Sequence, residues 1–355
     1  MKSYRAIALK LPELDCGVER LMALANLAHR GYRVEPPDLP KTVSIMLYRR
    51  RHELAFGTEP KRWLARTWFP LTTLRIGNGQ KIGDGGAPVV LDFDRGVVKL
   101  RFICHAEVPM PKWAYDRVSE GGDVKFALLG LKRGKPHLAL VAEREVELIQ
   151  TNSVLVVDVN SWRHGVVWAL IRDGKTTKWA RVRPDLGYIE RLYSEVVRLE
   201  HKYGKLERLG LHEGRDSKKL WRQIKQKRRR LYAYLRDFAQ KAAHRLALKA
   251  VKRRAEVWID DMLEESRREL IEEKLPSDLV KLYMLYLRRF INLLTNQLAW
   301  YGIPYRFKRL PSTVCPVCGS ELTQLPDRTM VCQCGFREKR DLVPIRWALK
   351  YTSPP

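Results

Sequence analysis

The chain has 355 residues, which is long enough for two or three domains with cores that need no disulfides. Lys and Arg outnumber Asp and Glu by 67 to 40, giving a formal net charge of +27. This excess predicts a polyanionic partner, most simply nucleic acid, with an anionic membrane surface as the competing choice. No apolar run approaches the roughly 18 residues of a spanning helix, and the N-terminus shows no cleavable apolar core, so we expect a soluble, cytoplasmic protein.

Residues 1–150 are predicted to form a β-rich domain. Short segments such as PVVLDF and VVKLRFI are separated by the turn signals GNG, GDGG and DRG, a pattern typical of an antiparallel sheet or barrel. Helical patterns interrupt these segments early, so we expect a helical insertion at about 17–70.

The pattern changes after Glu147. The apolar run in NSVLVVDVN predicts a central strand buried on both faces, and HGVVWALI and TTKWARV follow as two more strands joined by an Asp-Gly turn. The elements expected next are helices at about 186–202, 216–254 and 277–301, strands at 256–260 and in PYRFKRL, and a last helix at 342–351. This order predicts an α/β domain of the ribonuclease H type over 151–355.

More than half of the net charge lies in residues 201–254, which contain 19 Lys and Arg residues and four acidic residues. Apolar residues at helical spacing, including Leu231 and Leu235, predict a long amphipathic helix with a basic outer face, with at most one break. The run KQKRRR carries one sign of charge, which favours nucleic-acid contact over a merely solvated helix face. The predicted contact residues are Lys225, Lys227, Arg228, Arg229 and Arg230.

Four of the six cysteines are clustered near the C-terminus, which in a reducing compartment favours a metal over disulfides. Cys315 and Cys318 form a Cys-Pro-x-Cys-Gly knuckle, and Cys332 and Cys334 form a shorter Cys-x-Cys-Gly knuckle. Two knuckles can supply four thiolates to one tetrahedral, structural zinc, which predicts a zinc ribbon at 312–337. The short second knuckle leaves open a ribbon that has lost its ion.

Three carboxylates stand at the ends of predicted elements. Asp158 lies late in its buried strand, Asp260 ends the strand AEVWID, and Asp341 precedes the last helix. Phosphodiester hydrolysis on such a fold needs distant carboxylates that converge on two magnesium ions, which prefer hard oxygen ligands. Spacing alone leaves structural alternatives open, namely an Asx-type turn for Asp158, a helix cap from Asp260 or Asp261, and an N-cap for Asp341.

The order of these pieces resembles the transposon-encoded TnpB family, relatives of the type V CRISPR effector nucleases, most strongly over 151–351. VLVVDVN, IDDM and CGFREKRDLVP resemble the segments that carry the family's three acids. The stretch RRFINLLTNQLAWYGIPYRFKRLPSTVCPVCG resembles its helix, Gly-Ile-Pro turn, strand and first zinc knuckle.

This resemblance implies a RuvC-like nuclease with an inserted zinc ribbon. Asp158, Asp260 and Asp341 would then be the catalytic, magnesium-binding acids, the four cysteines would bind structural zinc, and 186–254 would be a basic helical insertion. The N-terminal part would be a wedge-like β-barrel with a helical recognition insertion. The implied activity is RNA-guided cleavage of target DNA, with a guide RNA from the element's flanking sequence.

Three features depart from the family pattern. Asp260 stands where the family has Glu, the second knuckle is short, and Val343 and Pro344 follow Asp341 where Asn and small residues are usual. Two alternatives stay open, an RNA-guided DNA-binding protein with weakened or lost cleavage and a basic zinc-ribbon RNA-binding protein without a guide. Low Asn and Gln content with many Arg, Lys and Glu suggests a prokaryotic, thermophilic archaeal source.

Overall fold

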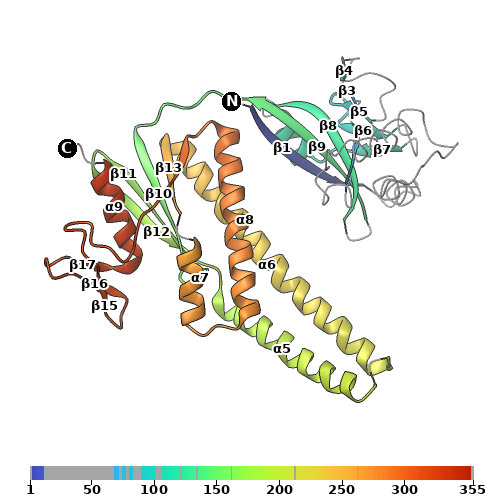
Figure 1. Ribbon diagram of the computed structural model, residues 1–355. Helices are drawn as coiled ribbons and strands as arrows, with labels where there is room; N and C mark the ends of the chain where they lie inside the picture. The colour runs from blue at the N-terminus through green and yellow to red at the C-terminus, as the bar shows by residue number, and fades with distance from the viewer. Residues whose placement is uncertain are drawn as a thin grey trace, which may run out of the picture. The chain divides into compact units, whose positions relative to one another are not determined.

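The computed structural model divides the chain into two compact units, Met1–Val146 and Glu147–Pro355 (Figure 1). The described residues are 2–11, 68–71, 74–76, 80–82, 89–100, 106–119, 122–132, 135–160, 162–211, 213–261 and 263–352. Both strands and helices occur, so the predicted mixed α/β, multi-domain class is confirmed. The helical insertion predicted at about 17–70 lies almost wholly outside the described residues.

The described strands of the first unit form two sheets. The first sheet has the order β1-β9-β8-β2 and consists of β1 (Lys2–Lys10), β2 (Trp68–Leu71), β8 (Asp123–Lys132) and β9 (Lys135–Glu145). The second has the order β4-β3-β5-β6-β7 and consists of β3 (Leu74–Ile76), β4 (Gln80–Ile82), β5 (Val89–Asp92), β6 (Val97–Leu100) and β7 (Ala106–Pro109). A short helix, α4 (Lys112–Ser119), follows β7. The first sheet is antiparallel throughout, as one of the two predicted arrangements requires, and the barrel implied by the resemblance stays a prediction.

The second unit is built on one five-stranded mixed sheet with the order β12-β11-β10-β13-β14. The strands are β10 (Ser153–Val159), β11 (Val166–Arg172), β12 (Lys175–Val182), β13 (Ala255–Asp260) and β14 (Tyr305–Lys308). The first three pair antiparallel as a meander, whereas β13 runs parallel to both β10 and β14. The apolar run in β10 is explained by its central place in this sheet.

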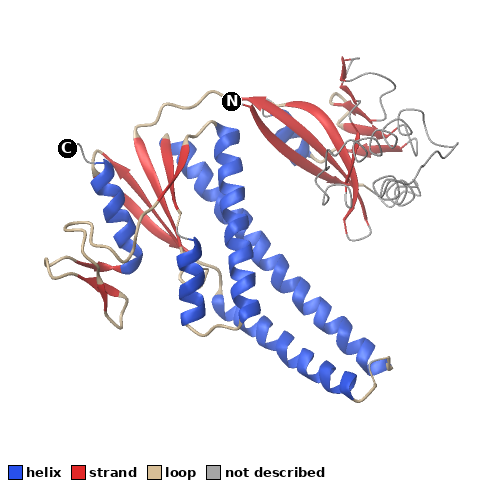
Figure 2. Ribbon diagram, viewed as in Figure 1, coloured by secondary structure: helices blue, strands red, loops and turns tan. Residues whose placement is uncertain are grey.

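Helices cover both faces of the sheet (Figure 2). They are α5 (Leu186–Arg208), α6 (Arg215–Arg253), α7 (Leu263–Glu272), α8 (Ser277–Tyr301) and α9 (Val343–Thr352). Because side chains alternate along a strand, Leu155 and Val157 of β10 join the core formed with α6 and α8, while Val156 packs beneath α9. Asp158 follows the same alternation and therefore lies on the α9 face.

The stretch 201–254 is broken once, between Arg208 at the end of α5 and Arg215 at the start of α6, as the sequence allowed, and α6 itself is continuous over 39 residues. It pairs with α5 as a helical hairpin that extends away from the sheet (Figure 1). Its buried side, which includes Ile224, Leu231 and Leu235, forms the predicted apolar stripe. Among the described helices, none combines the length and apolar character that a membrane crossing requires.

Candidate active site and cysteine cluster

Three acidic side chains are buried in the second unit. Asp158, Asp260 and Asp341 are 2%, 3% and 6% exposed, and among the residues that the structure describes they are the only buried acids. An ionised carboxylate loses its hydration when it is buried, so it persists only with close polar or cationic partners. These are the residues that the sequence singled out, and their catalytic role stays a prediction.

Asp158 and Asp260 are neighbours on the α9 face of the sheet. Val157 is the register partner of Ile259 in the parallel ladder between β10 and β13, so the next residue of each strand is one of the two acids. Adjacent strands lie about 4.8 Å apart. Two carboxylates separated by 102 positions in the chain are therefore brought together by strand pairing alone.

Cations flank this pair of acids in the same row across the sheet. Asp158 pairs with Val167 of β11, and Val167 pairs with Arg181 of β12. On the other side, Asp260 pairs with Lys308 of β14. The Arg181 guanidinium binds Asp341, and the Lys308 ammonium lies 3.7 Å from the centroid of the Trp258 ring, so both place positive charge beside the row.

Hydrogen bonds orient the two sheet acids. Asn160 Nδ2 donates to Asp158 Oδ2 at 2.5 Å, within the turn that follows β10. Asp260 Oδ1 accepts from the backbone N–H of Leu310 at 3.0 Å, which ties β13 to the segment after β14. The Asn160 contact joins two side chains, so it orients a buried carboxylate, whereas the Asx-type turn, in which Asp158 would accept a backbone N–H, stays a prediction.

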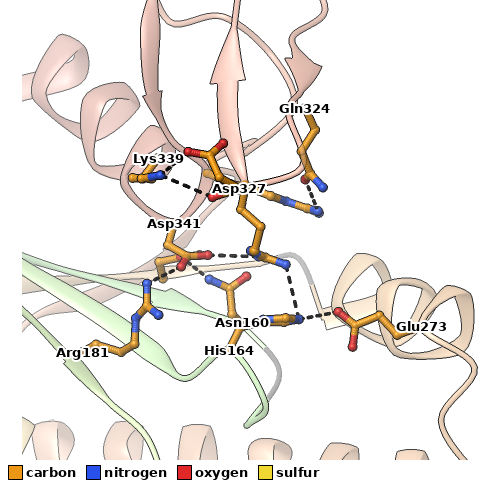
Figure 3. A network of polar contacts seen from close by, with 11 residues as sticks. Asn160, His164, Arg181, Glu273, Gln324, Asp327, Lys339 and Asp341 are labelled. Carbon is orange, nitrogen blue, oxygen red and sulfur yellow. Dashed lines mark hydrogen bonds and ion pairs between the residues drawn. The ribbon is translucent and has the colours of Figure 1, made fainter.

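Asp341 reaches the same region from a short 3-10 helix, η1 (Arg340–Leu342). Arg181 Nη2 donates to its Oδ2, and Arg328 Nη2 donates to its Oδ1 at 3.1 Å (Figure 3). Its two oxygens thus bind guanidinium groups from β12 and from the cysteine-containing segment. The N-cap interpretation does not describe this side chain, which faces the sheet and the ribbon.

Arg328 extends the network further along the surface of the site. Its Nη1 lies 3.4 Å from His164 Nε2, and that nitrogen lies 2.7 Å from Glu273 Oε1, to which it donates (Figure 3). Arg328 has a φ of 62° in the turn between β15 (Thr323–Gln324) and β16 (Thr329–Val331). Asp327 holds this turn through Thr329 and Lys339, and the hydrogen bond from Lys339 lowers the pKa of the Asp327 carboxyl.

Sequence analysis did not find Arg181, Arg328 or His164. Alternation along β12 could have placed Arg181 on the face of the acids, because the meander was predicted correctly. No sequence pattern indicates Arg328 or His164. Arg328 contacts Asp341, and His164 contacts Glu273, only because the tertiary fold brings them together.

The four predicted cysteines form one cluster, with Sγ atoms all within 4.8 Å of one another. Cys315 Sγ lies 3.6 Å from Cys334 Sγ, and Cys318 Sγ lies 3.4 Å from Cys332 Sγ. Four sulfurs around zinc at about 2.3 Å would stand roughly 3.8 Å apart. The cluster therefore has the donor set and the size for one tetrahedral zinc.

The short second knuckle still directs both sulfurs inward. In each knuckle a left-handed glycine follows the second cysteine, Gly319 with φ of 80° and Gly335 with φ of 89°. The backbone N–H of Gly335 donates to Cys332 O at 3.0 Å, as that of Gly319 does to Cys315 O at 2.9 Å. Hydrogen bonds with Ser320 lower the pKa of the Cys318 thiol to about 6, which favours the thiolate that a metal requires.

The cysteine ribbon is fixed to α9, and this contact places Asp341. Its strands β15, β16 and β17 (Arg337–Lys339) form a three-stranded sheet. Trp347 Nε1 of α9 donates to Val314 O, and Lys350 Nζ donates to Pro316 O, each at 2.9 Å. Cys315 also packs in one apolar cluster with Val343 at the start of α9. The ribbon and α9 thus hold η1 between them.

The five predicted nucleic-acid contacts divide into two groups. Lys227 forms an ion pair with Glu195 of α5, and Arg228 forms one with Glu200, so both hold the helical hairpin together. The other three, Lys225, Arg229 and Arg230, are exposed on α6.

Comparison with known families gives a match over the end of α8, β14, the ribbon and η1. Residues 288–344 match the model of the Cas12f1-like TNB domain. The predicted resemblance to TnpB and Cas12f-like RNA-guided nucleases is thereby confirmed, on the segment that carries Asp341 and the cysteines.

A solved structure described as the cryo-EM structure of the Cas12f1-sgRNA-target DNA complex is similar at 15% sequence identity and a TM-score of 0.45. The similarity covers 66% of this chain and 48% of that chain, so this chain matches about half of the other's length. Comparison with curated proteins gave no match.

Gly165, at the entrance to β11, controls the path of Arg181. Its φ is 88°, and an added Cβ would lie 2.9 Å from Val182 O and 3.0 Å from Arg181 Cγ. We expect Gly165→Ala to lower the free energy of unfolding by about 2 kcal/mol or more, since backbone strain and a clash add. Gly210→Ala is the control, because Gly210 has a φ of 70° with nothing within 4 Å. Equal decreases in urea unfolding would contradict this account.

Proposed function

We propose that the chain is an RNA-guided DNA endonuclease of the transposon-associated TnpB type, with a RuvC-like site formed by Asp158, Asp260 and Asp341. The observation that carries the proposal is their shared burial around one face of the sheet. The match of 288–344 to the Cas12f1-like TNB domain supports the class of protein. Guide RNA from flanking sequence and target DNA are the proposed partners, in keeping with the net charge of +27.

The strand order supports a RuvC-like, ribonuclease H type of nuclease domain over 151–355. An antiparallel meander is extended by two parallel strands. At the centre of the sheet β10 lies beside β13; the two are the first and fourth strands of this domain along the chain. Their carboxyl ends carry Asp158 and Asp260. Open sheets with parallel strands place ligand sites at such strand ends.

Magnesium is the cation that suits these donors. The three carboxylates are hard oxygen ligands and are shielded from water, whereas the four thiols are gathered separately in the ribbon. When bound, magnesium would supply an activated hydroxide and stabilise the leaving oxygen. Arg181 and Arg328 orient Asp341 and add positive charge at the place where a phosphodiester must approach.

Asp158→Ala and Asp341→Ala should each reduce magnesium-dependent cleavage of target DNA more than about 1,000-fold, because each removes a carboxylate that acts on the reacting phosphate. Guide RNA binding should persist. Asp261→Ala is the matched control, since Asp261 is the exposed neighbour of Asp260 and should retain activity. The measurement is cleavage of labelled target DNA by the purified protein–RNA complex.

Equal cleavage by wild type and both variants would reject the site. Retention of target DNA by the wild type without any nick would favour the alternative of an RNA-guided binder. Co-purification of mixed ribosomal and transfer RNA in place of one guide would favour a zinc-ribbon RNA-binding protein.

We further propose that the cysteine cluster binds one structural zinc. Metal analysis should give one zinc per chain, and Cys315→Ser should lower both zinc content and the melting temperature, because Cys315 is buried in the ribbon core. Val317→Ser is the control, as Val317 is exposed within the same knuckle. A folded wild type that contains no zinc would contradict the assignment.

The exposed cations of α6 are proposed to bind nucleic-acid phosphates. Lys225→Ala with Arg229→Ala should reduce the slope of log affinity against log salt by roughly 0.7 to 0.9 for each phosphate that is no longer neutralised. Lys227→Ala with Arg228→Ala removes the same charge from groups paired to α5. This second pair should change the slope less and lower the melting temperature more. The prediction fails if both pairs change the slope equally.

A further inference from the structure

An exposed indole lies close to the candidate site. Trp179 of β12 is 51% exposed, more than any other tryptophan in the described part of the chain. Single exposed apolar side chains are common on protein surfaces, so the exposure of Trp179 gains meaning only from what surrounds it.

Strand register places Trp179 on the same face as the acids. Trp179 pairs with Ala169 of β11, and Ala169 pairs with Val156 of β10. This row lies beside the row that contains Arg181 and Asp158, because alternate residues share a face. Two residues along a strand span about 6.6 Å and two strand spacings about 9.6 Å, so the backbones of Trp179 and Asp158 are roughly 12 Å apart.

The indole is not part of the packing beneath α9. Ile345 of α9 packs with Val167 and Ala169, and Leu342 covers them from the edge. Trp179 lies farther out, on β12, which ends the sheet. Among the described residues of β10, β11 and β12 it is the one large exposed apolar side chain, which is too small an apolar area for a protein interface.

The charge around Trp179 is positive. Arg181 follows Trp179 by two positions on β12 and so shares its face, and Arg183 is exposed just beyond the strand. A lone aromatic face among cations suits a single-stranded nucleic acid, whose bases stack while its phosphates face Lys and Arg. It does not suit a second copy of this basic chain, because like charges would meet.

We propose that Trp179 stacks on an unpaired base of the DNA strand that enters the candidate site. The inference rests on the proposed function and deepens it. Trp179 would be a positioning residue that fixes the DNA strand relative to Asp158, whose row across the sheet is the next one along β12.

The test uses the full chain with guide RNA in an Asp158→Ala background, so that DNA is bound but not cut. A short single-stranded oligonucleotide containing 2-aminopurine is added at raised salt, where phosphate contacts weaken and stacking persists. Anisotropy reports affinity, and 2-aminopurine fluorescence reports stacking. Trp179→Ala should weaken binding about 5- to 100-fold and restore the 2-aminopurine fluorescence that stacking quenches. Trp179→Phe should retain most of the affinity and most of the quenching.

Trp113→Ala, which removes a similarly exposed tryptophan of α4, is the control and should behave as the parent protein. Circular dichroism verifies the fold of each variant. Binding and fluorescence of Trp179→Ala that equal those of the parent would overturn the inference and leave the proposed nuclease intact. Absence of oligonucleotide binding by the parent also overturns it, whereas the proposed function fails separately if wild type and Asp158→Ala cut equally.

Discussion

The burial of three carboxylates around one sheet face is the constraint on which the second unit depends. Each acid must keep a partner, because an unpaired buried charge would cost several kcal/mol. Asp158 has the Asn160 amide, Asp260 the Leu310 N–H, and Asp341 two guanidinium groups. These contacts stabilise the acids but do not remove their mutual repulsion. Three such groups held together suit a cationic ligand, which is why we propose a chemical role for them instead of a packing role.

Two of the acids come from the sheet, whereas the third depends on the ribbon. Asp341 lies in η1 between the cysteine-containing segment and α9, and Trp347 and Lys350 of α9 bind the carbonyls of the first knuckle. Arg328, from a turn of the ribbon, binds Asp341 itself. A metal that folds the ribbon would therefore also set the position of a carboxylate in the site. The ribbon is a structural support for the acid, which explains why the cysteines precede Asp341 so closely in the chain.

The sequence predicted the elements of the second unit well and singled out three acids that the structure buries, because both follow from local patterns. The apolar run of β10 ends at a polar turn, and Asp158 stands where the pattern changes. The partners were harder to predict. Lys227 and Arg228 belong to a run that looks uniformly solvent-facing, yet each meets a glutamate of α5, because the hairpin brings the two helices together. The second knuckle looked too short, but the Gly335 N–H donates to the carbonyl of Cys332, three residues back, whereas the Gly319 N–H donates to that of Cys315, four residues back. Tertiary contacts and backbone conformation of this kind leave no periodic signal.

The positive charge of the chain offsets an electrostatic repulsion that the proposed function involves. A site made of three carboxylates repels the polyanion on which it must act. Arg181 and Arg328 both bind Asp341, so the local field is partly balanced without nucleic acid. In the proposed function, exposed cations of α6 would act over a longer range and draw phosphates toward the unit. Internally paired cations thus position the acids, while exposed cations would recruit the proposed substrate. A neutral chain with the same three acids would fold its sheet but would hold nucleic acid weakly beside them.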